Sequence, residues 1–226
     1  MAQDLLEFSD VIWLSPDSLL TMARRTKAEA ESTRAAILDA AELLFFQQGV
    51  SRTTLEKIAV AANVTRGAIY WHFQNKADLF NAMLERVRLP FQHMLDALDN
   101  NTTEDPFAQV RQLYIDGLQL IAGSEQHHRV LTIVFHRCEY IDELNPAVTK
   151  QDELDDQAVA VMQRAFERAE QAGLLRDGVS PRLAAMSLHM YVGGIISHFL
   201  LKPQQCDLCQ HAPALIDTML QGLKKP

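Results

Sequence analysis

The chain has 226 residues, a formal net charge of −8 and three cysteines. This length buries a sizeable core and favours a division into one smaller and one larger unit. No apolar run approaches the roughly 18–20 residues that span a bilayer, and the N-terminus lacks the basic region of a secretory signal. The odd cysteine count argues against a disulfide framework. These features together predict a cytoplasmic protein with no membrane partner.

The charge is divided unevenly along the chain. Residues 1–21 hold four acidic residues and no Lys or Arg, residues 22–90 hold ten basic and seven acidic residues, and residues 91–226 hold eleven and eighteen. The net charges of these segments are therefore −4, +3 and −7. A basic head on an acidic body predicts that the head faces nucleic-acid phosphates and that the body stays away from them.

The first helix is predicted to start at Thr26 and Glu29, which have the spacing of a capping box. Apolar residues follow at the spacing of a core-facing stripe, and they are Ile37, Leu38, Ala41, Leu44 and Phe45. Gly49 is expected to end the helix, because glycine readily adopts the left-handed conformation found after a helix.

Residues 53–73 have the pattern of two short helices joined by a tight turn, a helix-turn-helix. Thr53 and Glu56 predict a capping-box start, Asn63 suits a left-handed end, and Thr65 is expected to cap the second helix. The second helix should bury Ile69 and Phe73, which leaves five residues for an outer face suited to a DNA major groove. They are Arg66, Gly67, Tyr70, Trp71 and His72. Burial in the core is an equal alternative for Trp71, and a plain surface position is the alternative for His72.

The rest of the chain is also helical in its periodicity. A fourth helix is predicted to open at Asn75, with Pro90 kinking or interrupting it. Further helical patterns cover 106–122, 126–137, 146–172, 181–202 and 213–224. Asn145 and Ser180, each followed by a proline, are expected to cap two of these helices, and Gly173 should end the longest. The predicted fold class is all-α, with a three-helix N-terminal head on a larger helical body.

Several runs of residues carry a resemblance to a known family. The most specific is Val64-Thr-Arg-Gly-Ala-Ile-Tyr-Trp-His-Phe73, and weaker matches stand at 23–27, 37–41, 49–50, 53–54, 136–140 and about 200–208. The chain resembles the TetR family of bacterial repressors, most of all the multidrug-efflux repressors of the AcrR and TtgR type. The resemblance implies a helix-turn-helix DNA-binding domain over 22–75 and a helical ligand-binding and dimerisation domain over 76–226. Residues 1–21 are interpreted as an N-terminal extension from a non-native start, the alternative being a genuine packed arm.

The resemblance also assigns DNA contacts. Arg66 and Gly67 correspond to positions that approach base edges. Phosphate contacts correspond to Thr54, Thr65, Tyr70, His72 and Lys76. Arg24 and Arg25 fall in a basic arm ahead of the first helix, of a kind that enters a neighbouring minor groove. The implied partner is double-stranded operator DNA with an inverted repeat, because one short recognition helix reads too few base pairs for genomic specificity.

For the body, the resemblance implies a homodimer and a cavity for a hydrophobic small-molecule effector. The expected cavity lining is Ile133, Val134, Cys138, Met162 and Phe166. The interface is expected on helices 181–202 and 213–224, with Gly193 and Gly194 allowing close approach. Its apolar surface is expected from Leu183, Met190, Ile195, Phe199, Ile216, Met219, Leu220 and Leu223.

The expected function is a ligand-released transcriptional repressor of a multidrug efflux-pump operon, with a TetR-type regulator of a metabolic or stress operon as the alternative. A third hypothesis is a helical thiol or metal protein built on Cys206 and Cys209 with His211 nearby. A tetrahedral metal site would need a fourth ligand, so we expect no metal and no cofactor. The sequence shows no ordered set of nucleophile and base and no glycine-rich phosphate loop, so an enzyme is not expected.

Overall fold

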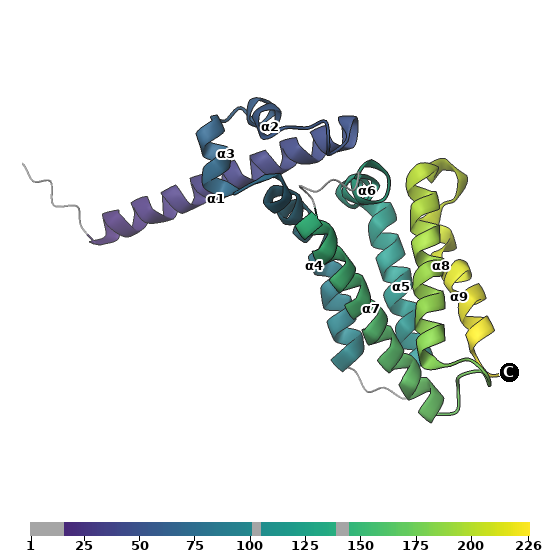
Figure 1. Ribbon diagram of the computed structural model, residues 1–226. Helices are drawn as coiled ribbons and strands as arrows, with labels where there is room; N and C mark the ends of the chain where they lie inside the picture. Colours follow the sequence, from purple (N-terminus) through teal and green to yellow (C-terminus); the bar gives the residue numbers. More distant parts are fainter. Residues whose placement is uncertain (1–15, 101–104, 139–144) are drawn as a thin grey trace, which may run out of the picture.

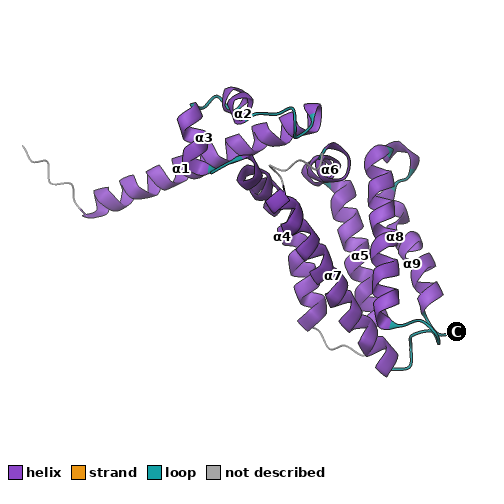
Figure 2. Cartoon of the chain, viewed as in Figure 1, coloured by secondary structure: helices purple, strands orange, loops and turns teal. Residues whose placement is uncertain are grey.

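The computed structural model describes residues 16–100, 105–138 and 145–226, and the side chains of 26–100, 105–138 and 152–226. Over these ranges the chain forms helices and no strand (Figure 2), which confirms the all-α prediction. The elements are α1 Pro16–Gln48, α2 Leu55–Ala61, α3 Arg66–His72, α4 Lys76–Asn100, α5 Pro106–Gly123, α6 Glu125–Thr132, a π-helical turn Ile133–Arg137, α7 Asn145–Gln171, α8 Pro181–Leu201, a 3-10 turn Pro203–Gln205 and α9 Leu208–Leu223. Figure 1 shows α2 and α3 lying along α1, and α4 running from this head into a bundle with the later helices.

The first helix starts earlier than the capping box predicts. It begins at Pro16 and continues for 33 residues, so residues 24–27 are helical and do not form an arm ahead of it. Pro16 suits the first position of a helix, and the segment from there to Thr26 contains no glycine and no second proline. Nothing in that segment interrupts the helix, so the capping-box spacing at Thr26 falls inside it.

The helix-turn-helix forms as predicted except at its first residue. Thr54, not Thr53, caps α2, and its hydroxyl accepts from the backbone N–H of Lys57. Thr53 is buried and donates its hydroxyl proton to the carbonyl of Gly49 at 2.8 Å. Asn63 has a φ of 54°, the left-handed conformation expected after α2. Thr65 caps α3 by accepting from the backbone N–H of Ala68 at 3.2 Å.

Two hydrophobic cores hold the chain together. The first is formed by α1, α2, α3 and α4. It also includes Val130 of α6 and Ile133 of the π-helical turn, both fully buried. The second lies among α4, α5, α7, α8 and α9. Ala77 to Val87, in the first three turns of α4, belong to the first core, whereas Leu98 near its end belongs to the second. Helix α4 therefore contributes to both cores.

Two prolines lie inside helices. Pro90 does not interrupt α4, which runs on to Asn100. Pro213 lies in α9, which starts at Leu208, five residues before the prediction, because Asp207 caps it by accepting from the N–H of Gln210. A proline at 213 has no N–H for the carbonyl of Cys209, and that carbonyl accepts from Gln119 at 3.2 Å instead.

Three of the other predicted helix ends are confirmed. Gly49, directly after α1, and Gly173, two residues after the end of α7, have positive φ angles of 86° and 72°. Ser180 caps α8 by accepting from the N–H of Leu183. Asn145 is the first residue of α7, and its side chain lies outside those described.

Helix α8 is more apolar than the sequence analysis anticipated. Among the described helices it alone is long and apolar enough to cross a membrane, with a mean hydropathy of 1.4 over its most apolar stretch. Only 33% of that stretch is buried inside the chain. Its inner side, with Ala184, Ala185 and Leu188, packs in the second core. The outer side exposes further apolar residues, so α8 has two apolar faces where a surface helix usually has one.

Candidate DNA interface and effector-binding region

The outer face of α3 is the clearest candidate site. Ile69 and Phe73 are buried at 1% and 2% exposure, as predicted, and anchor α3 to the first core. Tyr70 is 47% exposed and Trp71 is 72% exposed, so Trp71 is not a core residue. The face therefore presents two large aromatic side chains to solvent, an arrangement suited to contact with another molecule.

Arg66 is held in a defined orientation on this face. Its guanidinium lies 3.0 Å from a carboxylate oxygen of Glu56 on α2, and 5.6 Å from the centre of the Tyr70 ring. A hydrogen bond with Tyr70, and then the charge of Glu56, raise the pKa of Arg66 further above its usual value. The arginine is permanently charged and projects between α2 and α3, where it is available to a guanine edge or a phosphate.

The lack of a side chain at Gly67 is not required by the fold. A Cβ built there would have Oγ1 of Thr65 as its nearest neighbour, at 3.9 Å, which is ordinary contact. Its φ is not in the left-handed region, since the positive-φ glycines of the described chain are Gly49, Gly173 and Gly178. Internal packing therefore gives no reason for glycine at this exposed position, whereas the close approach of another molecule does.

The remaining predicted DNA contacts differ in their accessibility. Thr54 and Thr65 are exposed at the starts of α2 and α3. His72 is half-buried, with its ring edge-on to Trp71 at 4.5 Å between centroids, and burial lowers its pKa. Burial thus disfavours the charged form of its imidazole.

Lys76 occupies a different environment from the one expected. The side chain is 7% exposed, and its ammonium donates to the carbonyl of Thr53 at 3.3 Å. This bond connects the start of α4 to the loop before α2. The ammonium has three donors, so a phosphate contact is compatible with the bond to Thr53 but would have to reach a side chain that is only 7% exposed. Arg24 and Arg25 have helical backbones in α1, and their side chains lie outside those described.

The five predicted cavity residues are divided between the two hydrophobic cores. Ile133 is fully buried in the first core, with Val134 and Cys138 packed against it. Met162 and Phe166, each 1% exposed, lie in the second core, where Phe166 packs edge-on against Phe107 at 5.6 Å. The sequence could not separate the two cores, because apolar periodicity shows that a residue is buried but not which neighbours surround it.

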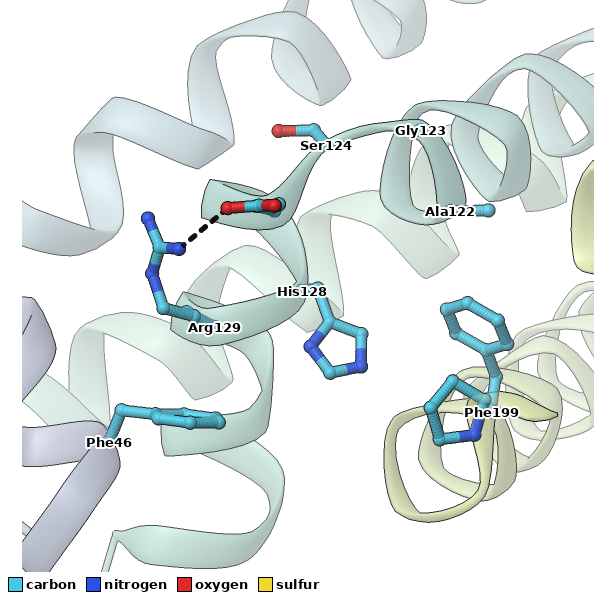
Figure 3. Close-up of a pocket in the computed structure, with 9 residues that line it drawn as sticks. Phe46, Ala122, Gly123, Ser124, His128, Arg129 and Phe199 are labelled. Atoms are coloured by element: carbon cyan, nitrogen blue, oxygen red, sulfur yellow. Dashed lines mark hydrogen bonds and ion pairs between the residues drawn. The ribbon is translucent and has the colours of Figure 1, made fainter.

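A cleft of about 440 Å³ lies instead where α1 meets the body. The residues that line it come from α1, from the corner between α5 and α6, and from the end of α8 with the turn after it (Figure 3). They are Phe46, Ala122, Gly123, Ser124, Glu125, His128, Arg129, Phe199 and Pro203. This cleft could not be predicted from the sequence, because no local pattern indicates that three distant segments meet.

Next to the cleft, an ion pair joins the two domains. Glu42 of α1 is buried, with a side chain 3% exposed, and accepts from Nε of Arg129 at 2.8 Å. Gln126 donates to the other carboxylate oxygen at 3.3 Å, and Glu125 pairs with Arg129 at 3.3 Å. Hydrogen bonds to Glu42 and Glu125 raise the pKa of Arg129, against the effect of burial. Helix α6 is thereby fixed to the helix that carries α2 and α3.

The cysteines form no evident metal site. Cys206 is half-buried after the 3-10 turn, and Cys209 is exposed in the first turn of α9. The ring of His211 lies 2.8 Å from the carbonyl of Asp207. Among the described residues no group of three or more His, Cys, Asp or Glu side chains is placed to hold a metal ion.

The predicted interface residues divide into exposed and buried sets. Leu183 and Met190 of α8 are 52% and 66% exposed, as an interface requires. Ile195 and Met219 are half-buried against the second core. Four further residues, Phe199, Ile216, Leu220 and Leu223, are buried in this core, so the single chain presents little of their apolar surface. Three of these four lie on α9, whose apolar side packs inside the chain. Helix α9 is also bound to α5, because Arg111 donates to both carboxylate oxygens of Asp217, at 2.6 and 2.9 Å.

A helix-turn-helix with an exposed polar and aromatic face, attached to a helical body, defines a DNA-binding regulator. Comparison with known proteins makes this specific. Residues 37–83 match the bacterial regulatory proteins of the tetR family, and residues 105–225 match the C-terminal region of MAATS-type transcriptional repressors. The chain is 37% identical over 203 residues to the HTH-type transcriptional repressor BepR of Brucella suis, covering 90% of this chain and 97% of BepR.

Solved structures give the same result. NalD, the secondary repressor of the MexAB-OprM multidrug efflux pump in Pseudomonas aeruginosa, is 39% identical with a TM-score of 0.81, covering 88% of this chain and 98% of NalD. SmeT, the repressor of the Stenotrophomonas maltophilia multidrug efflux pump SmeDEF, is 34% identical in its complex with triclosan. Its TM-score is 0.76, covering 86% of this chain and 92% of SmeT. The chain therefore belongs to the TetR family of bacterial transcriptional regulators, which confirms the resemblance found in the sequence.

Proposed function

We propose that this protein represses transcription of a multidrug efflux-pump operon and leaves its operator when a hydrophobic compound binds. The observation that carries the proposal is the outer face of α3, where Arg66, Gly67, Tyr70 and Trp71 are exposed although internal packing requires none of them there. The similarity to NalD and SmeT, both described as efflux-pump repressors, supports the choice of operon. The proposal assigns no enzymatic activity to the chain and places it on DNA in the cytoplasm.

Most of the residues around this face receive a role. Arg66 reads a base edge, with Glu56 and Tyr70 holding its guanidinium in place. Gly67 lets the helix approach the groove. Thr54, Thr65, Tyr70 and His72 donate hydrogen bonds to phosphates, which fix the register without reading sequence. Lys76 acts at the start of α4 by holding the loop before α2, and Arg24 and Arg25 meet the DNA from α1.

The functional unit in the proposal is a homodimer on an inverted repeat. The outer stripe of α8, with Leu183, Met190, Gly194 and Leu201 at helical spacing, is exposed and mostly apolar. Gly193 and Gly194 have no atom within 4 Å of a built Cβ, so a second helix could approach closely there. A self-complementary contact of this kind produces a two-fold dimer and explains why α8 has two apolar faces. Helix α9 contributes less than the sequence predicted, because its apolar side is buried.

The test is an electrophoretic mobility shift of the full chain on DNA upstream of its own gene and upstream of an efflux-pump operon. We expect a shifted band at nanomolar protein, as usual for specific sites, and its loss when triclosan is added. Arg66→Ala serves as the control that removes base reading. An absence of sequence-specific binding to either DNA, or binding that no hydrophobic antimicrobial weakens, would overturn the proposal.

A further inference from the structure

Glu56 is the one acidic residue in the helix-turn-helix sequence, residues 53–73, where Lys57 and Arg66 are basic. It lies in the first turn of α2, and its side chain is 49% exposed. DNA carries one negative charge per about 1.7 Å of helix axis. A carboxylate in the unit that docks on DNA therefore opposes the binding of any sequence, and its presence there needs a specific reason.

The carboxylate of Glu56 is bound by two residues that the proposed DNA interface also uses. Its Oε1 lies 3.0 Å from Nη2 of Arg66, which projects from the next helix. The pKa of Glu56 is lowered by its own backbone N–H, then by a hydrogen bond from the hydroxyl of Thr54, and also by the charge of Arg66. In the free chain this carboxylate therefore occupies donors that are assigned to DNA, as a phosphate oxygen would.

A role at the start of α2 does not account for both contacts. An acidic residue in the first turn stabilises a helix through the free N–H groups there, and Glu56 has that position. Such a role needs no partner on another helix, and Thr54 already caps α2 by accepting from the N–H of Lys57. The contact with Arg66 instead joins α2 to α3, at the residue placed to read a base edge.

We propose that Glu56 determines DNA specificity by neutralising Arg66 on DNA that lacks the operator sequence. On such DNA, Arg66 stays paired with Glu56 and adds no net charge to the contact with phosphates. On the operator, the five N–H donors of the guanidinium let one edge bind a guanine while another keeps its bond to Glu56. Specificity is a difference between two affinities, so a residue that weakens mainly the wrong complex raises it. This role rests on the proposed function, because it concerns how the same face of α3 selects its DNA.

Glu56→Gln tests the proposal, because it removes the charge and keeps the size of the side chain. Fluorescence anisotropy measures the affinity of the full chain for operator DNA and for non-operator DNA of equal length over a range of salt concentrations. The freed Arg66 should neutralise one more phosphate, so the salt slope on non-operator DNA should steepen by about 0.9. Extrapolated from 1 M salt, this slope gives about eightfold tighter non-operator binding at about 0.1 M salt.

On the operator Arg66 is already engaged, so the affinity of Glu56→Gln for it should change by less than about twofold. Discrimination between the two DNAs should therefore fall about five- to tenfold. If Glu56 served only the start of α2, its replacement would lower the melting temperature and weaken both complexes. That result has the opposite sign to the expected gain on non-operator DNA, and would overturn the proposal.

Two further variants separate the Glu56–Arg66 pair from a general effect of charge. Glu170→Gln makes the same change at an exposed position of α7 and should keep both wild-type affinities. Arg66→Ala combined with Glu56→Gln should lose the steeper non-operator slope, because the freed guanidinium is then absent. A steeper slope that persists in this double variant would overturn the proposal, since another cation would be making the contact.

An equal change on operator and non-operator DNA in Glu56→Gln would also overturn the specificity role. If the wild-type chain still discriminated the operator in that case, the proposed function would stand without it. A wild-type chain that discriminates no operator would refute the proposed function and the role of Glu56 together.

Discussion

Gly67 gives the sharpest test of the DNA interface, because folding and DNA binding make opposite demands on it. A Cβ at this position would meet only Oγ1 of Thr65, at 3.9 Å. Alanine is favoured over glycine within a helix by about 0.5–1 kcal/mol. Gly67→Ala should therefore raise the free energy of unfolding by that amount. For a chain of this size the corresponding rise in melting temperature is roughly 1–4 °C.

The same methyl group should weaken operator binding. It would stand on the exposed face of α3, next to Arg66, and hold the helix away from the base edges. Loss of one well-formed base contact costs about 1–3 kcal/mol, which is about a five- to 150-fold loss of affinity. Fluorescence anisotropy on operator DNA measures this loss, and thermal unfolding of the same sample measures the gain in stability.

Gly222→Ala is the matched control. Gly222 is exposed in α9, and a built Cβ there has no atom within 4 Å. This variant should gain stability in the same way and keep the operator affinity of the wild type. Wild-type affinity in Gly67→Ala would show that α3 does not dock through this face. A loss of stability in Gly67→Ala would show that the position is less open than its surroundings indicate.

Four other single variants, and one double variant, test the rest of the structure. Arg66→Ala should reduce discrimination between operator and mutated operator by about tenfold or more, measured by competition binding, and unchanged discrimination would remove Arg66 from base reading. Arg129→Met should lower stability by about 3 kcal/mol, or roughly 6–12 °C in melting temperature, because it leaves Glu42 buried and unpaired. Adding Glu42→Met to it should restore part of the loss, and equal loss in the single and double variants would contradict this. Met190→Glu should give monomers by analytical ultracentrifugation and weak operator binding, whereas a dimer of wild-type affinity would place the interface away from α8. Lys76→Met should lower stability and leave the salt dependence of operator binding nearly unchanged, whereas a slope that falls by about one would instead indicate a direct phosphate contact.

The helix boundaries that the sequence predicted correctly depend on interactions between near neighbours. Asn63 takes its left-handed conformation, Gly173 ends α7, and Thr65 and Ser180 accept from backbone N–H groups three residues later. Each feature involves groups within one helical turn, so a few letters of sequence contain the physical cause. The burial of Ile69 and Phe73 followed from periodicity for the same reason.

The features that the sequence did not predict arise from how the loops and helices pack. Thr54 caps α2 in place of Thr53, because the buried Thr53 donates its hydroxyl proton to Gly49. Lys76 was assigned to a phosphate contact, and in the structure its buried side chain donates to Thr53, 23 positions earlier in the chain. The division of Ile133 and Phe166 between two cores, and the meeting of α1, α6 and α8 at the cleft, likewise arise only when the helices pack.

The Glu42–Arg129 ion pair indicates how much free energy couples α1 to α6. A hundredfold release from an operator requires about 2.8 kcal/mol of differential binding. Leaving a buried carboxylate without its partner costs about 3–5 kcal/mol, and Glu42, with a side chain 3% exposed, fits that case. The orientation of α1 against α6 is therefore held by an interaction comparable to the whole energy of release. An effector that acts on Arg129 need not deform the body, since weakening this one pair is sufficient. Because Gln126 also donates to Glu42, partial displacement of Arg129 would leave one hydrogen bond in place, so α1 could shift without the domains separating.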